Sequence, residues 1–112
     1  MFLVGIDISK YKHDCCIIAS DGEIIRKPFS FKNNAEGFSV FLDTLHSLPD
    51  SQGIRIGFEA TAHYALNLKL FLEKDHCVFM ELNPVLLAKF NKSQSIKKTR
   101  RMQLIATLLL AV

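Results

Sequence analysis

The sequence predicts an α/β fold, a mixed five-stranded sheet whose elements follow the order β-β-β-α-β-α-β-α. Two observations predict it. The N-terminal part of the chain carries three strand-like runs separated by turn signals, with no helical pattern between them. The rest alternates short apolar runs with stretches whose apolar residues recur as on one face of a helix. Strands separated by helices usually join a parallel sheet through right-handed crossovers.

The first three strands should form an antiparallel meander. We expect them at Phe2–Ile8, His13–Ser20 and Glu23–Phe31. Asp21-Gly22 stands between two apolar runs and is typical of a hairpin turn. Pro28 cannot donate to a strand ladder, which indicates that part of the third strand lies at a sheet edge or a bulge.

The later elements are predicted from caps and periodicity. Asn33 and Asn34 can cap a helix that ends near Pro49. The apolar face of this helix is formed by Phe38, Phe41, Leu42 and Leu45. There follow a strand at Ile54–Glu59, a helix at Thr61–Lys74, a strand at Cys77–Leu82 and a helix from Pro84 to about Asn91. Residues 1–91 would then form one domain, and residues 92–112 a basic arm with an apolar tail.

Charge is distributed unevenly along the 112 residues. The formal net charge is +3, yet residues 1–82 hold 8 Lys and Arg against all 11 Asp and Glu, whereas residues 83–112 hold six bases and no acid. Such asymmetry favours an acidic partner. No apolar run is long enough to span a bilayer, and three cysteines cannot all pair with one another. We therefore expect a soluble protein of the reduced cytoplasm with no membrane partner.

Two carboxylates are candidates for chemistry. Asp7 interrupts the apolar first strand, and Glu59 ends the fourth. An ionised carboxylate in an apolar strand is costly unless it faces solvent, pairs with a base or binds a metal. If these strands are parallel neighbours, both acids converge at the carboxyl end of the sheet, where open α/β sheets place ligands.

Two such acids would bind Mg²⁺ or Mn²⁺, which prefer hard oxygen ligands. A pair of these ions about 4 Å apart can clamp the attacking and leaving oxygens of a phosphodiester. The alternative from spacing alone is that Asp7 faces solvent and that Glu59 caps the next helix.

Four ordered motifs carry a resemblance to a known family. They are Gly5-Ile6-Asp7-Ile8-Ser9-Lys10, Phe58-Glu59-Ala60-Thr61-Ala62-His63-Tyr64, Leu82-Asn83-Pro84 and Lys97-Lys98-Thr99. The chain resembles the N-terminal domain of the DEDD-type insertion-sequence transposases, the IS one-ten family, whose catalytic domain is similar to the RuvC resolvase. The resemblance implies a ribonuclease-H-like fold and metal-dependent cleavage or exchange of DNA strands. It also implies that Asp7 and Glu59 are the first two of four catalytic acids.

The sequence departs from this family after Thr99. The family expects Lys-Thr-Asp-x-x-Asp, which supplies the third and fourth acids, but residues 100–112 contain no acid. Codons compatible with this stretch can be read in another frame as Lys-Thr-Asp-Ala-Ile-Asp. We therefore hypothesise that the residues after about Thr99 are a frameshifted tail and that the protein is a truncated transposase, inactive alone. Sequencing the gene tests this hypothesis.

The basic residues are candidates for phosphate contacts. They are Lys89, Lys92, Lys97, Lys98, Arg100 and Arg101, with Lys10 beside the first acid. Phosphate contacts would make binding depend on salt, whereas the alternative for the arm is a solvated surface. The almost wholly apolar run from Met102 to Val112 would pack on the sheet, form a subunit contact or promote aggregation. The histidines show no metal-ligand spacing with the cysteines and are assigned to packing or to the surface.

Two other functions compete with a metal-dependent transposase. The first hairpin is also similar to the phosphate-binding hairpin of actin-like sugar kinases, although the second glycine-rich loop of those kinases is missing. A non-catalytic nucleic-acid-binding or oligomerisation fragment is the alternative in which the basic arm and apolar tail carry the function. The family resemblance further implies transposon-end and target DNA, a possible guide RNA, a homo-oligomer and a bacterial or archaeal cytoplasm.

Overall fold

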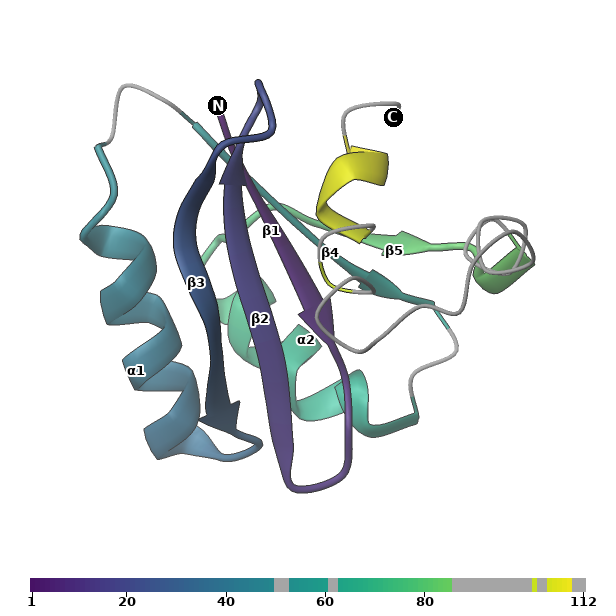
Figure 1. Ribbon diagram of the computed structural model, residues 1–112. Helices are drawn as coiled ribbons and strands as arrows, with labels where there is room; N and C mark the ends of the chain where they lie inside the picture. Colours follow the sequence, from purple (N-terminus) through teal and green to yellow (C-terminus); the bar gives the residue numbers. More distant parts are fainter. Residues whose placement is uncertain (50–52, 61–62, 86–101, 103–104, 110–112) are drawn as a thin grey trace.

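The computed structural model describes residues 1–49, 53–60, 63–85, 102 and 105–109. Its five strands, in sheet order, are β3 (Ile24–Lys32), β2 (Lys12–Ala19), β1 (Phe2–Asp7), β4 (Ile54–Glu59) and β5 (Phe79–Leu82). The helices are α1 (Ala35–His46) and α2 (Leu66–Lys74), the latter preceded by the 3-10 turn η2 (His63–Ala65). The first three strands pair antiparallel, whereas β1, β4 and β5 are parallel (Figure 1). The predicted mixed five-stranded α/β fold is confirmed.

The β2–β3 hairpin turns where the sequence predicts it. Gly22 has a φ of +93°, a conformation that costs glycine little, and its amide donates to the Ala19 carbonyl at 2.9 Å. Asp21 Oδ1 accepts from the amide of Glu23 at 2.9 Å. The register shifts between Cys15 and Ile17, opposite the part of β3 that contains Pro28. β3 is also an edge strand. The prediction that Pro28 lies at a sheet edge or a bulge is therefore confirmed.

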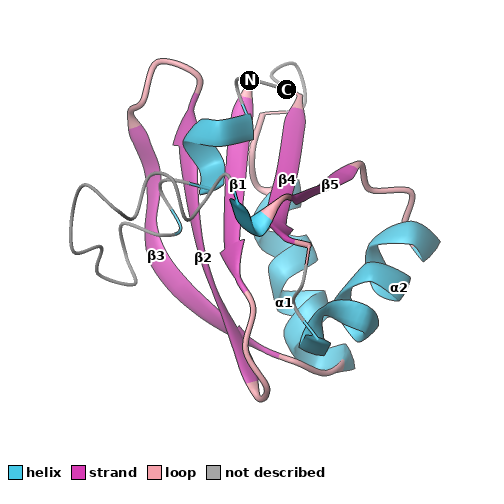
Figure 2. Ribbon diagram, turned by 90° about the vertical axis from the view of Figure 1, so that its right-hand side faces the viewer, coloured by secondary structure: helices cyan, strands magenta, loops and turns pink. Residues whose placement is uncertain are grey.

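One face of the sheet is covered by α1 and α2 (Figure 2). Side chains alternate along a strand, so Val4 and Ile6 of β1 point into this core, where both are fully buried. Phe41 of α1 stacks on Phe31 of β3 with ring centroids 4.5 Å apart. Complete burial of each large apolar side chain stabilises the fold by about 1.5–3 kcal/mol.

The other face carries a second core beneath the C-terminal segment. Met102, Ile105, Ala106 and Leu109 recur at helical spacing and are at most 3% exposed. The segment lies close to the sheet because β1 and β4 present Gly5 and Gly57 beneath it. A Cβ at Gly5 would be 2.1 Å from the Met102 carbonyl oxygen, and one at Gly57 would be 2.5 Å from Leu109 Cδ2. The sequence left three possibilities for the apolar tail, namely packing on the sheet, a subunit contact or aggregation. The described residues of the tail pack on the sheet.

Several element boundaries differ from the predicted ones. Asn34 caps α1 by accepting from the Gly37 amide at 2.8 Å. The Asn33 side chain does not cap the helix but donates to the Lys10 and Tyr64 carbonyls. The predicted helix at 61–74 is divided between η2 and α2, and residues 61–62 lie outside the described part. The predicted strand at Cys77–Leu82 begins only at Phe79, after a turn in which His76 has a φ of 57°. Among the described residues, no helix has the length and hydropathy to cross a membrane.

Candidate metal site at the carboxyl end of the sheet

Asp7 and Glu59 end two neighbouring parallel strands. The register pairs Leu3 with Arg55 and Gly5 with Gly57, so the two acids stand at equivalent positions two residues further on. Equivalent residues of adjacent strands point to the same face, here the face that also carries the glycines. Both acids are partly buried. Their strands are the parallel neighbours that the sequence analysis required for convergence.

A third carboxylate, which the sequence analysis missed, lies on the same face. Asp14 of β2 is directly opposite Asp7 in the antiparallel ladder, and residues so paired point to one side. The hydroxyl of Ser30 on β3 donates to Asp14 Oδ1. Counting pairs outward from the β1–β2 loop would have revealed this position, because the register of a hairpin fixes which side chains share a face.

The donor set suits a hard cation. Within the described residues, no three or more His, Cys, Asp and Glu side chains are gathered closely enough to hold a metal ion. Mg²⁺ is commonly bound by only one or two carboxylates, with water and substrate phosphates completing the octahedron. Asp7 and Glu59 therefore fit such an ion as a partial ligand set.

Lysines surround the same end of the sheet. Lys12 and Lys32 face each other across the β2–β3 ladder, and both are exposed. Like charges directly opposite each other destabilise a sheet. In the described part of the chain neither lysine forms an ion pair, and the pair that does occur joins Lys69 to Glu81 at 2.8 Å. Lys10, from the predicted set, is exposed with its Nζ 5.2 Å from the Tyr11 ring centroid.

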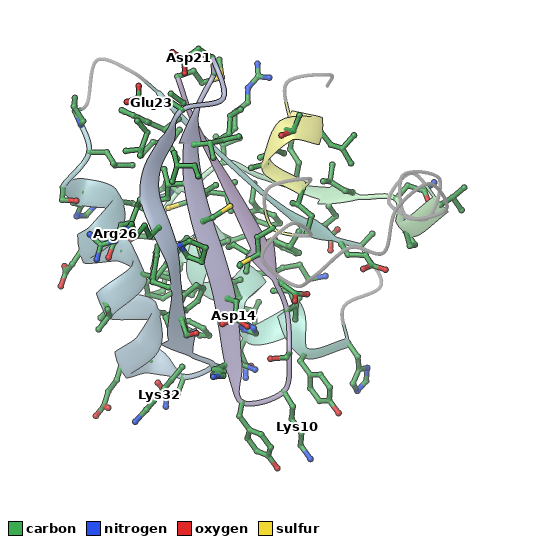
Figure 3. The ribbon with its side chains drawn as sticks, in the orientation of Figure 1. Lys10, Asp14, Asp21, Glu23, Arg26 and Lys32 are labelled. Atoms are coloured by element: carbon green, nitrogen blue, oxygen red, sulfur yellow. The ribbon has the colours of Figure 1, made fainter. Side chains whose placement is uncertain are left out.

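Figure 3 shows Asp21 and Glu23 at the hairpin tip, far from the end where Lys10 and Lys32 lie. Lys10, Lys12 and Lys32 therefore share one end of the sheet with the candidate metal ligands. The other predicted bases, Lys89, Lys92, Lys97, Lys98, Arg100 and Arg101, lie outside the described residues, as does most of the arm proposed at 92–112.

The histidines and cysteines add no metal ligands. His13 is fully buried, whereas His46, His63 and His76 are exposed, as expected for packing and surface residues. Burial lowers the pKa of His13. Burial also raises the pKa of Cys16 to about 11 and that of Cys15 well above its usual value, so both thiols are inert at neutral pH.

Comparison with known proteins identifies one family. A family model described as a transposase, of the DEDD type found in IS110 insertion sequences, matches residues 4–102. The matched range contains both candidate acids, β2 to β5 in full and the part of β1 that follows Leu3. A search of curated proteins finds no match.

Proposed function

Because the chain belongs to the IS110-type DEDD transposase family, we propose that Asp7 and Glu59 hold a Mg²⁺ or Mn²⁺ ion at a site for cleaving and exchanging DNA strands. The observation that carries the proposal is the register of β1 and β4, which puts the two acids at equivalent positions on one face. Other residues of this end would hold the DNA.

The ion, when bound, supplies positive charge to the phosphodiester under attack. The residues of this chain orient that ion and the DNA backbone around it. Asp7 and Glu59 approach from neighbouring strands, so a single cation can be held between them. Their partial burial strengthens the electrostatic attraction to a cation, because water screens it less.

The lysines would hold the flanking phosphates. Lys12 and Lys32 repel each other in the free protein, and a polyanion placed over them relieves this repulsion. The two lysines lie at the same end of the sheet as the acids, so phosphates held by the lysines would lie near a phosphate at the cation site. Phosphate contacts of this kind position DNA without reading its sequence.

This chain supplies two of the four acids of its family, because no acid follows Glu81. We therefore propose that it binds one cation and DNA, with little or no cleavage of its own. The frameshift after about Thr99 belongs to the same proposal. The described residues Met102 and Leu109 are buried against the sheet.

Titration of the purified chain with Mn²⁺ by calorimetry tests the metal site. Asp7→Asn and Glu59→Gln should each weaken binding at least tenfold, since each removes a charged ligand while preserving shape. Glu73→Gln, at an exposed position on α2, is the matched control and should bind like the unaltered chain. Equal affinity in all four proteins would refute the site.

A non-catalytic DNA-binding module is the second candidate, and the opposed Lys12–Lys32 pair favours it. Under this function the affinity for duplex DNA falls with salt and does not respond to changes in Asp7 or Glu59. Measuring that affinity with and without Mn²⁺ separates the two candidates, because only a metal-bridged complex gains affinity from the ion.

The remaining family expectations are parts of this proposal. They are transposon-end and target DNA as partners, a guide RNA, a homo-oligomer and a bacterial or archaeal cytoplasm. The family match supports the transposase over the sugar kinase.

A further inference from the structure

Asn33 joins two segments that are far apart in the sequence. It lies between β3 and α1, and its side-chain Nδ2 donates to the Lys10 carbonyl at 3.1 Å and to the Tyr64 carbonyl at 3.3 Å. Its backbone amide also donates to the Tyr11 carbonyl at 2.9 Å. One side chain therefore uses both of its amide hydrogens to connect the β1–β2 loop to η2.

These two segments directly follow the candidate ligands. Lys10 is three residues beyond Asp7, and Tyr64 is five residues beyond Glu59. The pairing of β1 with β4 ends at Gly5 and Gly57, two residues before the acids. The ladder between these strands therefore stops short of the carboxylates, although Asp7 is still paired with Asp14 of β2 and Glu59 with Leu82 of β5. Contacts between the segments that follow the two acids therefore add to the restraint on the distance between them.

The buried His13 ring lies near the Asn33 side chain. Its Nδ1 accepts from the Ser9 amide at 3.2 Å, so the proton of the neutral ring is on Nε2. That Nε2 and Asn33 Oδ1 are both buried, and among the described residues neither has a hydrogen-bond partner within bonding geometry, although Asn33 lies near enough to oppose the lowering of the His13 pKa. The His13 ring is held in turn by Phe31, at a centroid distance of 5.4 Å. The orientation of the Asn33 amide is therefore set by the two carbonyls that its nitrogen contacts.

We propose that Asn33 is a positioning residue for the Asp7–Glu59 cation site, because it holds the segment after Asp7 against the segment after Glu59. The inference rests on the proposed function, since it assigns a role at the same site. Groups behind metal ligands commonly change metal affinity 10- to 100-fold when they are removed. Asn33 acts in this way through the backbone.

Adjacent Asn34 provides a matched control. It is the same residue type, it also makes a side-chain hydrogen bond, and it caps α1 rather than joining the two segments. Asn34→Ala should destabilise the chain through loss of this cap and leave the segments connected. Asn33→Asp is the second test variant, because it keeps the size of the side chain but loses both donated hydrogens.

Amide hydrogen exchange and Mn²⁺ titration together test the proposal. In Asn33→Ala and Asn33→Asp, exchange should be about tenfold faster at residues 9–12 and also at 63–65, and Mn²⁺ should bind about tenfold more weakly. The added charge of aspartate would by itself strengthen cation binding. A loss of Mn²⁺ affinity in Asn33→Asp would therefore come from the altered positions of the two segments. Asn34→Ala should speed exchange only in the first turn of α1.

Each contrary result has a distinct meaning. Unchanged exchange in either segment, or unchanged Mn²⁺ affinity in folded Asn33 variants, overturns the role of Asn33. If the unaltered chain binds no Mn²⁺ through Asp7 and Glu59, the proposed function fails instead. The exchange pattern then still decides whether Asn33 connects the two segments.

Discussion

Replacing Gly5 with alanine tests how the C-terminal segment is seated. The added Cβ would lie 2.1 Å from the Met102 carbonyl oxygen and 2.9 Å from the Ala106 amide nitrogen. Ordinary contacts to a Cβ begin near 3.4 Å, so the segment would have to retreat by about 1 Å. Both atoms belong to the backbone, which cannot move aside as a flexible side chain can.

The magnitude follows from two limits. Full detachment would expose Met102, Ile105 and Leu109, each of which contributes about 1.5–3 kcal/mol when buried. A shifted but still attached segment costs about 1–3 kcal/mol, the usual range for overpacking. The shift is the cheaper response, so we predict that Gly5→Ala lowers the free energy of unfolding by about 1–3 kcal/mol.

Urea unfolding followed by far-ultraviolet circular dichroism measures this change. Gly57→Ala is the matched comparison, because its Cβ would meet the Leu109 side chain, whose end can rotate away. Its cost should therefore be smaller, below about 1.5 kcal/mol. In Gly57→Ala/Leu109→Ala the new methyl fills space left by leucine, so the double variant should be more stable than the two single changes predict, by at least about 0.5 kcal/mol. A Gly5→Ala protein as stable as the unaltered chain would refute the seating of this segment.

Three further predictions concern DNA, catalysis and pH. Lys12→Gln/Lys32→Gln should weaken duplex DNA binding and reduce the steepness of log affinity against log salt concentration by about 2. The control Lys74→Gln, on α2, should leave this slope unchanged. An unchanged slope in the double variant would exclude phosphate contacts by Lys12 and Lys32. The isolated chain with Mg²⁺ should cleave duplex or branched DNA negligibly. Robust cleavage that Asp7→Ala abolishes would contradict the proposal that this chain carries only two of the four acids that cleavage needs. Because burial lowers the pKa of His13 in the folded protein, its stabilising contribution is full above the unfolded value of about 6.5 and is lost as the pH falls below it. The midpoint temperature of thermal unfolding should thus fall between pH 7 and pH 5, and it should fall less in His13→Gln. An equal fall in both proteins would assign the effect to other groups.

The sequence predicts the elements and the two acids because their signals are local. Asp21-Gly22 marks a turn by its own conformational preference, and Pro28 marks a disturbed edge because it lacks an amide hydrogen. To predict that Asp7 and Glu59 converge, we needed one further assumption, that their strands are parallel neighbours. The sheet order confirms that the two strands are parallel neighbours.

The missed features depend on contacts between distant segments. Asn33 and Asn34 look alike as helix caps, and only the approach of the Lys10 and Tyr64 carbonyls separates their roles. Asp14 becomes relevant through the strand register rather than through its own neighbours in sequence. The apolar tail could be assigned to the sheet only once Gly5 and Gly57 were seen beneath it.

Nuclear magnetic resonance with Mn²⁺ locates the cation site, because this ion broadens the signals of nearby amides. We expect selective broadening around Asp7 and Glu59 at low Mn²⁺ concentration, and loss of that broadening in Asp7→Asn/Glu59→Gln. The amides of α1 beside Glu36 and Asp43 should keep their signals. Broadening that centres on other acids, or that persists in the double variant, would contradict a cation site at the carboxyl ends of β1 and β4.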